Sequence, residues 1–418
     1  MLFCMFPQSR LKLYTSLKQY FIVFSSYTSL QFDRGDYIKK LIFKFKSLTK
    51  KKFIIPVSTA RVGIYLVLRS ILKKNQQEVI LSPYTIADVV NMVIAAGGIP
   101  IFCDINRKTC NIDPKKVEKL INKNTAAIMI THFYGEICNI SEIEKISKKF
   151  NIPFIEDAAQ ALGAEYNKKM AGTFGIAGIY SFGMYKNINA FYGGLIITDD
   201  KKLAKNITLE IKTWPTQSKI HYFKKLASGI ATDLVTNRLF FGLFFFRFFR
   251  WAFIKKIDFI NNKLKIDVNP KLCSYLPESY KFNMSQTQAR LILLQINNLK
   301  INTKLRIKAA MHWHDGLKGN KFLILPKFTK NFSHMYWYFP IQFDKRNLLV
   351  AHVLKSGNDI TESYHRNCAN LKCFSDFKRN CPNAEKTANS LIYLPTYPGF
   401  NFKQLSSTVS SINSYFSK

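Results

Sequence analysis

The sequence predicts an α/β fold, in which helices cover both faces of a mostly parallel β-sheet and a smaller α+β domain follows. Between residues 51 and 200, short apolar segments alternate with amphipathic helical segments. This alternation is typical of β-α-β units, whose parallel strands are buried on both faces. From Ser279 onward a long helical segment leads into a mixed region with fewer strands, which indicates the second, smaller domain.

Apolar runs and capping residues predict the individual elements. Strands are expected at 53–57, 78–81, 100–104, 126–130, 153–156 and 195–198. Helices are expected to begin near Thr59, to span 86–96, to open at Asp113-Pro114, and to span 141–150 behind a Ser-x-x-Glu capping box. The later elements are a helix at 285–299, a strand at 337–343, and helices at 348–356 and 402–415.

Shifts in composition divide the chain into four predicted parts. They are an N-terminal segment (1–50), a large α/β domain (51–215), an aromatic and basic insertion (216–270) and a small C-terminal domain (271–418). Because ligands collect at the carboxyl ends of parallel strands, functional side chains are expected directly after the strands of the large domain.

The overall composition is that of a folded protein with an unusual charge. Apolar residues make up 47% and charged residues 21%, which excludes a disordered chain, a collagen-like repeat and a coiled coil. The 62 Lys and Arg against 26 Asp and Glu give a net charge of +36. This excess favours an anionic partner, which could be a phosphorylated small molecule, nucleic acid or an acidic membrane surface, unless it reflects compositional drift.

Location is predicted from the cysteines and the N-terminus. The eight cysteines form no Cys-x-x-Cys pair, and the first residues lack the pattern of a secretory signal. No uncharged run reaches the roughly 18–20 residues that span a bilayer. These features indicate a cytoplasmic protein without a zinc site.

Two charged residues near strand ends are the first candidates for chemistry. An apolar strand ends in Glu156-Asp157, and Asp157 could be a metal ligand, a ribose-binding acid, the partner of a cationic ring nitrogen or a helix cap. Lys186 lies between two apolar segments beside Gly193-Gly194. Desolvation there would lower its pKa and make it an imine-forming amine, although an isolated lysine is more often solvated.

Together these residues resemble the DegT-type sugar-nucleotide aminotransferases, which are pyridoxal-phosphate (PLP) enzymes of fold type I, the aspartate aminotransferase fold. The resemblance covers about 56–200 and resumes from Tyr280 to the C-terminus. Further matching segments are Val79–Thr85, Gly97–Asp104, Ile112–Pro114, His132–Gly135, Tyr280–Ser285, Pro382–Glu385 and Leu394–Gly399. Their number, order and spacing carry the resemblance.

The resemblance implies a PLP site. Lys186 would hold the cofactor as an imine and then carry a proton between substrate and cofactor, while Asp157 would keep the pyridinium nitrogen protonated. Ala159 would lie behind the ring, and Gln160 would reach its phenolic oxygen. The phosphate cup would comprise Ser58, Thr59 and Ala60 at a helix N-terminus, Ser181, and either Lys281 or Asn283 from the neighbouring subunit of a homodimer with shared active sites.

Three positions depart from the family pattern. Ile86 stands where members usually carry the Phe or Trp that stacks on the cofactor, which leaves the stacking residue open. Phe191-Tyr192 precedes Gly193-Gly194 in place of a Gly-Glu pair, and Trp337 replaces a common His. These departures concern the substrate pocket more than the cofactor site.

The implied activity is transfer of an amino group from an amino acid, expected to be glutamate, to a nucleotide-linked keto-sugar for amino-sugar or polysaccharide biosynthesis. The alternatives are a PLP-dependent sugar dehydratase and a non-catalytic, membrane-associated binding or regulatory protein of the same fold. The dehydratase branch is known for a His in place of the lysine, so Lys186 argues against it.

The segment 239–254 has nine aromatic residues among its sixteen. Seven Lys or Arg and one acidic residue lie between Arg238 and Lys265. A basic, aromatic and amphipathic segment is typical of an interfacial membrane helix, here at the inner face of a membrane. The alternatives are helices that pack on the domain or across a dimer interface and, least favoured, a nucleic-acid surface, so no nucleic-acid partner is expected.

Overall fold

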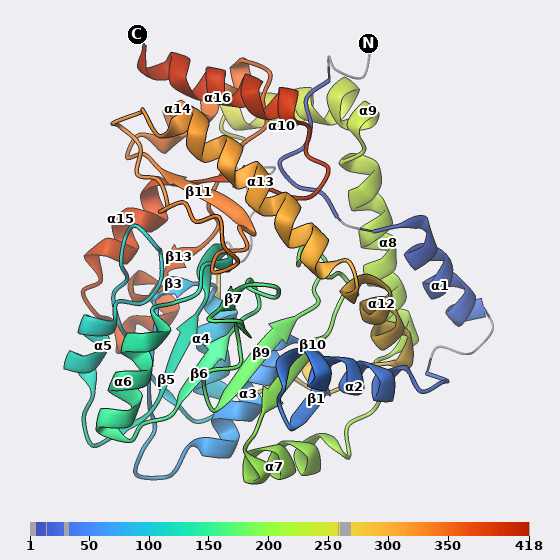
Figure 1. Cartoon of the computed structure of the whole chain (residues 1–418), viewed down its shortest axis with the longest axis vertical. Coiled ribbons are helices and arrows are strands. Elements are labelled where there is room, and N and C mark those ends of the chain that lie inside the picture. Colours follow the sequence, from blue (N-terminus) through green and yellow to red (C-terminus); the bar gives the residue numbers. More distant parts are fainter. Residues whose placement is uncertain (1–5, 14, 29–32, 258, 260–268, 418) are drawn as a thin grey trace.

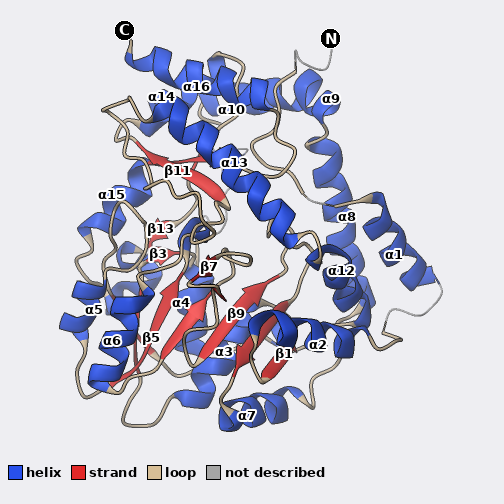
Figure 2. Cartoon of the chain, viewed as in Figure 1, coloured by secondary structure: helices blue, strands red, loops and turns tan. Residues whose placement is uncertain are grey.

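The computed structural model describes all residues except 1–5, 14, 29–32, 258, 260–268 and 418. A seven-stranded sheet forms the centre of the larger part, and a three-stranded sheet lies in the C-terminal part (Figures 1 and 2). The α/β class predicted from the sequence is confirmed.

The central sheet is parallel except for one strand. Its order is β1 (Phe53–Val57), β10 (Gly194–Thr198), β9 (Ala177–Ser181), β6 (Phe154–Asp157), β5 (Thr125–Thr131), β2 (Glu78–Leu81) and β4 (Ile99–Phe102). β10 pairs antiparallel with both β1 and β9, whereas the remaining neighbours pair in parallel. The carboxyl ends of six strands therefore share one edge of the sheet, where the site is expected.

Helices cover both faces of this sheet. On one face, Gly63 of α3 (Ala60–Ile71) lies so close to β9 that a Cβ there would be 3.1 Å from Cγ2 of Ile179. On the other face, Phe45 of α2 (Tyr37–Thr49) packs on Tyr180 with ring centroids 5.9 Å apart. Because Ile179 and Tyr180 are successive strand residues, they point to opposite faces, and both faces are buried.

Three other helices of the large domain lie close to their predicted positions: α4 (Ala87–Ala95), α5 (Pro114–Leu120) and α6 (Ile140–Phe150). α7 (Lys201–Ile211), which follows β10, was not predicted. Asp113 caps α5 as predicted, but the capping box expected at Ser141 is wrong. Asn139 caps α6 instead, because an equally good capping side chain two residues earlier accepts a hydrogen bond from Glu142 N (3.4 Å) and starts the helix sooner.

Two α-helices in the described residues of the C-terminal part were not predicted, α13 (Leu299–Leu317) and α15 (Pro382–Ser390). The helix expected at 285–299 is α12 (Gln286–Ile296), which ends before two asparagines that favour caps over helix interiors and separate it from α13. β11 (Tyr338–Gln342), β14 (Leu391–Pro395) and β12 (Thr361–Glu362) form the antiparallel sheet of this part. Its remaining α-helices are α14 (Arg346–Lys355) and α16 (Phe402–Phe416).

The aromatic insertion folds as two helical arms. α8 (Lys219–Val235) is followed by α9 (Arg238–Phe240), a π-turn (Phe241–Phe245) and α10 (Phe246–Ile254). Phe241 and Phe246 are buried in the core of the C-terminal part, whereas Phe244, Phe248 and Trp251 are exposed. Some aromatic side chains of this segment are therefore buried in the protein, while others, on a different face, are exposed. Residues 258 and 260–268 of the insertion lie outside the described residues, and the domain limits stay predictions.

Glu156, next to the candidate Asp157, has a structural position. It is fully buried, and its carboxylate accepts hydrogen bonds from Gly172 N (2.7 Å), Phe174 N (2.6 Å), Gly175 N (2.7 Å) and the ring of His132 (2.9 Å). His132 Nδ1 accepts from Cys138 N (3.1 Å), so the Nε2 nitrogen carries the proton given to Glu156. This carboxylate ties the 172–175 loop to the sheet and has no free acceptor for a ligand.

We expect Glu156→Gln to lower the free energy of unfolding by about 2–4 kcal/mol, because one oxygen that accepts N–H donors becomes a donor itself. Urea unfolding followed by circular dichroism measures this change. Glu142→Gln is the matched control, because Glu142 is half-exposed and paired with Lys145, and it should change stability by no more than about 0.5 kcal/mol. Equal stability of the two variants would contradict the assigned role of Glu156.

Candidate active site

Lys186 lies in the loop between β9 and β10, at the predicted edge of the sheet. Its Nζ is 4.2 Å from the ring centroid of Trp337, and the indole Nε1 of Trp337 donates to Tyr185 O (2.8 Å). The indole is thereby fixed over the lysine. The face of an aromatic ring attracts a cation, so Trp337 holds the side chain in place.

Burial changes the protonation of Lys186. Desolvation lowers its pKa to about 8, opposed by the carboxylate of Asp157 and reinforced by the guanidinium of Arg61. A lysine with this pKa has a substantial neutral fraction near physiological pH, and only the neutral amine is a nucleophile. The sequence-based expectation of a desolvated amine agrees with this environment.

Asp157 is buried at the carboxyl end of β6. Desolvation raises its pKa above the usual value, against the lowering effects of the Ala159 N–H and the Lys186 ammonium. Its Oδ1 accepts from Ala159 N (3.0 Å), but residues 159–163 form turns rather than an α-helix. The helix-cap alternative for Asp157 is therefore wrong. Burial leaves its carboxylate poorly solvated, so a cation in addition to Lys186 would stabilise it.

Gln160 joins this pair to the C-terminal part. Its Oε1 accepts from Tyr134 N (2.8 Å), which turns its Nε2 toward Nε2 of His365 at 3.5 Å. Desolvation, followed by the charge of Lys186, lowers the pKa of His365 to about 3. A neutral His365 can accept a hydrogen bond from the amide of Gln160. Ala159, between Asp157 and Gln160 in the sequence, has a small side chain that leaves room on this side of the site.

A buried network of hydroxyl groups continues from His365. His365 Nδ1 is 2.6 Å from the Tyr393 hydroxyl, and the chain of contacts continues over Ser363 (2.9 Å) and Tyr84 (2.9 Å) to Tyr134 (2.7 Å). Sequence reasoning missed this network. Tyr84 and Tyr134 lie in segments that resemble family signatures, but nothing local in the sequence indicates that they meet residues 279 and 231 positions away.

The predicted phosphate cup lies at the start of α3. Thr59 caps this helix, accepting from Val62 N (3.3 Å), and Ser58 donates to Tyr280 O (2.9 Å). The sheet register places Gly194 between Val57 and Ser181. A Cβ on Gly194 would lie 2.7 Å from Ala60 N and from the Thr59 carbonyl carbon, so only glycine allows β10 to approach the helix start.

Lys281 and Asn283 differ in how freely they can reach a ligand. The amide of Asn283 donates to the carbonyls of Ile211 (3.1 Å) and Trp214 (2.8 Å) and anchors its own chain. Lys281 extends along the surface and pairs with Glu278 (2.5 Å). Of the two residues predicted to reach a neighbouring subunit, Lys281 has the freer charged group, and the role itself stays a prediction.

Arg61 is a further charged residue near the site that sequence reasoning missed. Its guanidinium pairs with Asp88, lies 3.2 Å from the Tyr280 hydroxyl, and stacks on that ring at 5.1 Å. It directly follows Ser58-Thr59-Ala60, which was the available signal. A fixed cation beside a helix N-terminus adds positive potential to the cup.

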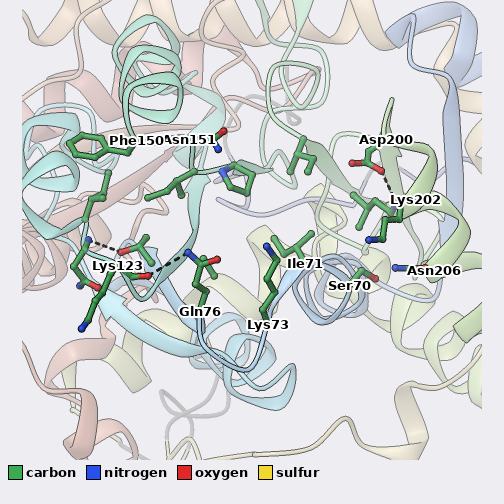
Figure 3. Close-up of a pocket in the computed structure, with 18 residues that line it drawn as sticks. Ser70, Ile71, Lys73, Gln76, Lys123, Phe150, Asn151, Asp200, Lys202 and Asn206 are labelled. Atoms are coloured by element: carbon green, nitrogen blue, oxygen red, sulfur yellow. Dashed lines mark hydrogen bonds between the residues drawn. The ribbon is translucent and has the colours of Figure 1, made fainter.

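A groove of about 750 Å³ lies elsewhere. It is found where β5, β6 and β9 begin and is lined by Ser70, Lys73, Lys123, Phe150 and Asp200 among others (Figure 3). A polar cavity of about 300 Å³ adjoins the site instead and is lined by Ser363, His365 and Arg366 among others. The charged side chains, rather than the groove of about 750 Å³, locate the chemistry.

These residues fit PLP. One edge of the sheet carries four groups that suit the four functional groups of PLP. The desolvated amine suits its carbonyl, and the buried carboxylate suits its cationic ring nitrogen. The helix N-terminus with close glycine packing suits its phosphate, and the amide suits its phenolic oxygen. The indole of Trp337 lies beside the Lys186 amine. Ile86, where the resemblance leads one to expect a stacking aromatic ring, is aliphatic.

Comparisons with known proteins agree with this arrangement. The model of the DegT/DnrJ/EryC1/StrS aminotransferase family matches residues 22–229 and 264–413, and the unmatched stretch falls within the predicted insertion. The chain is 28% identical to the uncharacterized protein MJ1066 of Methanocaldococcus jannaschii, over 85% of this chain and 83% of that protein. It is 25% identical to the dTDP-3-amino-3,6-dideoxy-alpha-D-galactopyranose transaminase of Aneurinibacillus thermoaerophilus, over 89% and 88%.

Solved structures share the fold across the whole chain. PseC of Helicobacter pylori, an aminotransferase involved in the biosynthesis of pseudoaminic acid, superposes with a TM-score of 0.76 at 19% identity, covering 98% of this chain and 99% of that one. The E. coli GDP-4-keto-6-deoxy-D-mannose-3-dehydratase with bound hydrated PLP reaches a TM-score of 0.75 at 20% identity, covering 98% and 100%. With the family model matching most of its length, the chain belongs to the DegT/DnrJ/EryC1/StrS aminotransferase family, whose members depend on PLP and adopt fold type I.

Proposed function

We propose that this protein transfers an amino group from an amino acid, glutamate, to a nucleotide-linked keto-sugar. The observation that carries the proposal is the desolvated Lys186 amine beside the buried Asp157 carboxylate. The sugar transaminase among its relatives supports the substrate class. The cytoplasmic location expected from the sequence remains a prediction.

Each residue of the site has a defined task in this proposal. PLP, when bound, supplies an electron sink for the carbon that exchanges its amine. Lys186 would hold it covalently and, once released, would carry a proton on Nζ, while Asp157 would keep the ring nitrogen protonated. Gln160 would donate from Nε2 to the ring oxygen, and Ser58, Thr59, Ala60 and Ser181 would offer backbone and hydroxyl groups to the phosphate.

Two alternatives are distinguishable. The dehydratase fold neighbour makes loss of water from the sugar a conceivable reaction, but a lysine amine at position 186 favours amine transfer. A non-catalytic, regulatory member of the family would not need an amine with a pKa near 8 beside a carboxylate. Product mass separates the two reactions, and a visible absorbance of lysine-bound cofactor separates both from a non-catalytic role.

We expect the purified protein, incubated with PLP, glutamate and a panel of nucleotide-linked keto-sugars, to convert at least one sugar to its amine. Lys186→Ala should abolish both turnover and the visible absorbance of bound cofactor, because it removes the desolvated amine that lies beside Asp157. Mass spectrometry of the sugar and absorbance spectra measure the two effects.

The control for this experiment is Lys205→Ala, which removes an exposed lysine of α7 and should leave both readouts unchanged. Amination by the Lys186→Ala variant would refute the assignment, and a product lighter by one water would favour the dehydratase.

Asp157→Asn should leave cofactor binding largely intact but slow transamination by about a hundredfold or more. A neutral amide of the same shape cannot stabilise a proton on the ring nitrogen, so the electron sink weakens. Single-turnover kinetics with glutamate measure the effect. A cofactor analogue methylated on the ring nitrogen carries a permanent charge and should restore part of the rate in Asp157→Asn; normal turnover of the variant with PLP itself would rule out this role.

We further propose that the active unit is a homodimer with shared active sites, in which Lys281 of one subunit completes the phosphate cup of the other. The segment at 280–283 touches its own cup, because Ser58 donates to Tyr280 O, whereas the ammonium group of Lys281 is partly exposed and pairs with Glu278 of the same segment. Asn283 is bonded within its own chain and is better suited to hold this segment in place.

Mixing Lys186→Ala with Lys281→Ala subunits tests this sharing. If Lys281 acts across the interface, a hybrid dimer contains one intact site, and a random mixture should regain about a quarter of wild-type activity. If Lys281 acts within its own subunit, no hybrid site is intact. Tags of different size on the two variants verify exchange, and absence of rescue despite exchange would refute sharing.

A further inference from the structure

Helices at one side of the molecule expose apolar side chains at helical spacing. We call this surface the aromatic face: the outward sides of α1 (Leu17–Thr28), α8, α9 and α10, with Phe21, Phe24, Phe223, Phe244, Phe248 and Trp251 as its largest members. Phe21 is 69% exposed and Phe244 63% exposed. Side chains this large and this open on four neighbouring elements need a covering partner.

These helices are apolar on their inward sides as well. Tyr222, Leu226 and Gly229 of α8 are buried against the protein, as are Phe246 and Ala252 of α10. A surface helix of a water-exposed protein normally carries polar residues opposite its buried stripe. The outward apolar side is therefore not needed for folding of the chain itself.

The helices that carry these exposed stripes lie side by side or follow one another directly. α1 and α8 lie side by side, with the rings of Tyr27 and Phe223 5.4 Å apart and the Tyr20 hydroxyl bonded to Asp233 (2.5 Å). α8 leads directly into α9 and α10, which turn across the upper end of the molecule in Figure 1. α8 and the following helical arm are bent by 58° relative to each other, so the surface is L-shaped.

Its charge is strongly positive. These helices contain seven Lys or Arg residues and a single acidic residue, Asp233, which is engaged by Tyr20. Lys255 and Lys256 follow α10 directly and are exposed. A second copy of this chain would bring equal charges together across the contact, which is unfavourable, whereas an anionic surface is complementary.

The geometry points to a surface that lies on a membrane. Within the described ranges, no single helix has the length and apolar composition to cross one; α8 together with the arm that follows it does, by length and composition only. Both arms, however, bury one side in protein. We propose that the aromatic face docks on an anionic lipid bilayer, with Phe and Trp side chains in the headgroup region and Lys and Arg beside acidic headgroups.

Vesicle flotation of the purified full-length protein tests the proposal. At low salt the protein should rise with phosphatidylcholine vesicles that contain about one quarter phosphatidylglycerol, and much less with phosphatidylcholine alone. The triple variant Phe244→Ser, Phe248→Ser and Trp251→Ser should lower the partition coefficient by about a hundredfold or more, since each inserted aromatic side chain contributes roughly tenfold or more.

The chain offers a matched control. Ile99, Phe150 and Leu209 are also exposed apolar residues, but they lie on β4, α6 and α7, away from the aromatic face. Ile99→Ser, Phe150→Ser and Leu209→Ser together should float like wild type. Circular dichroism and cofactor absorbance, unchanged in both triple variants, exclude unfolding as the cause.

Three outcomes would overturn the proposal. The first is a wild-type protein that stays at the bottom of the gradient at low salt with acidic vesicles. The second is a Phe244, Phe248 and Trp251 variant that floats as well as the control. The third is a change of oligomeric state in sedimentation, without lipid, on introducing these three serines, together with no flotation of wild type; the aromatic face would then be a contact between copies of the chain.

Discussion

The amine of Lys186 and the carboxylate of Asp157 share one desolvated site, and the charge state of each depends on the other. Burial disfavours both charged forms, while their mutual attraction favours both. Neither group could stay ionised there alone at low cost. The rest of the site is arranged around this balance: a helix N-terminus and Arg61 add positive potential, and the Trp337 indole faces the amine.

The reversed strand β10 makes this arrangement possible. Because β10 runs against its neighbours, the chain that leaves β9 at Ser181 must return to the same edge of the sheet, and Lys186 lies in that return. Gly194 then allows β10 to press against the first residues of α3. One loop thus supplies the amine, and the strand that follows it supplies the close packing of the phosphate cup.

Local patterns in the sequence predicted much of the fold and the central pair of the site. Strand-end position indicated Asp157, and the environment between apolar strands indicated Lys186. Competing local preferences explain the errors: Asn139 took the cap expected for Ser141, and turns follow Asp157 where a helix was conceivable. The hydroxyl network was beyond prediction, since Tyr84 and Ser363 are 279 positions apart and each alone reads as an ordinary buried polar residue.

The helices of the aromatic face also support the active-site loop, but with different side chains. The Tyr222 hydroxyl of α8 donates to Ala190 O (3.0 Å), and a Cβ on Gly229 would lie 2.6 Å from the ring of Phe191. From α1, Gln19 donates to Asn189 O (3.2 Å). Phe191 has a positive φ of 64°, a conformation that this packing maintains. Inward residues of these helices thus hold the return loop behind Lys186. Among the exposed residues of α8, His221 also reaches this loop, where its ring stacks on Tyr192 with ring centroids 5.5 Å apart. Phe244, Phe248 and Trp251 lie on the following helical arm instead, so these outward aromatic residues can change without disturbing the chemistry.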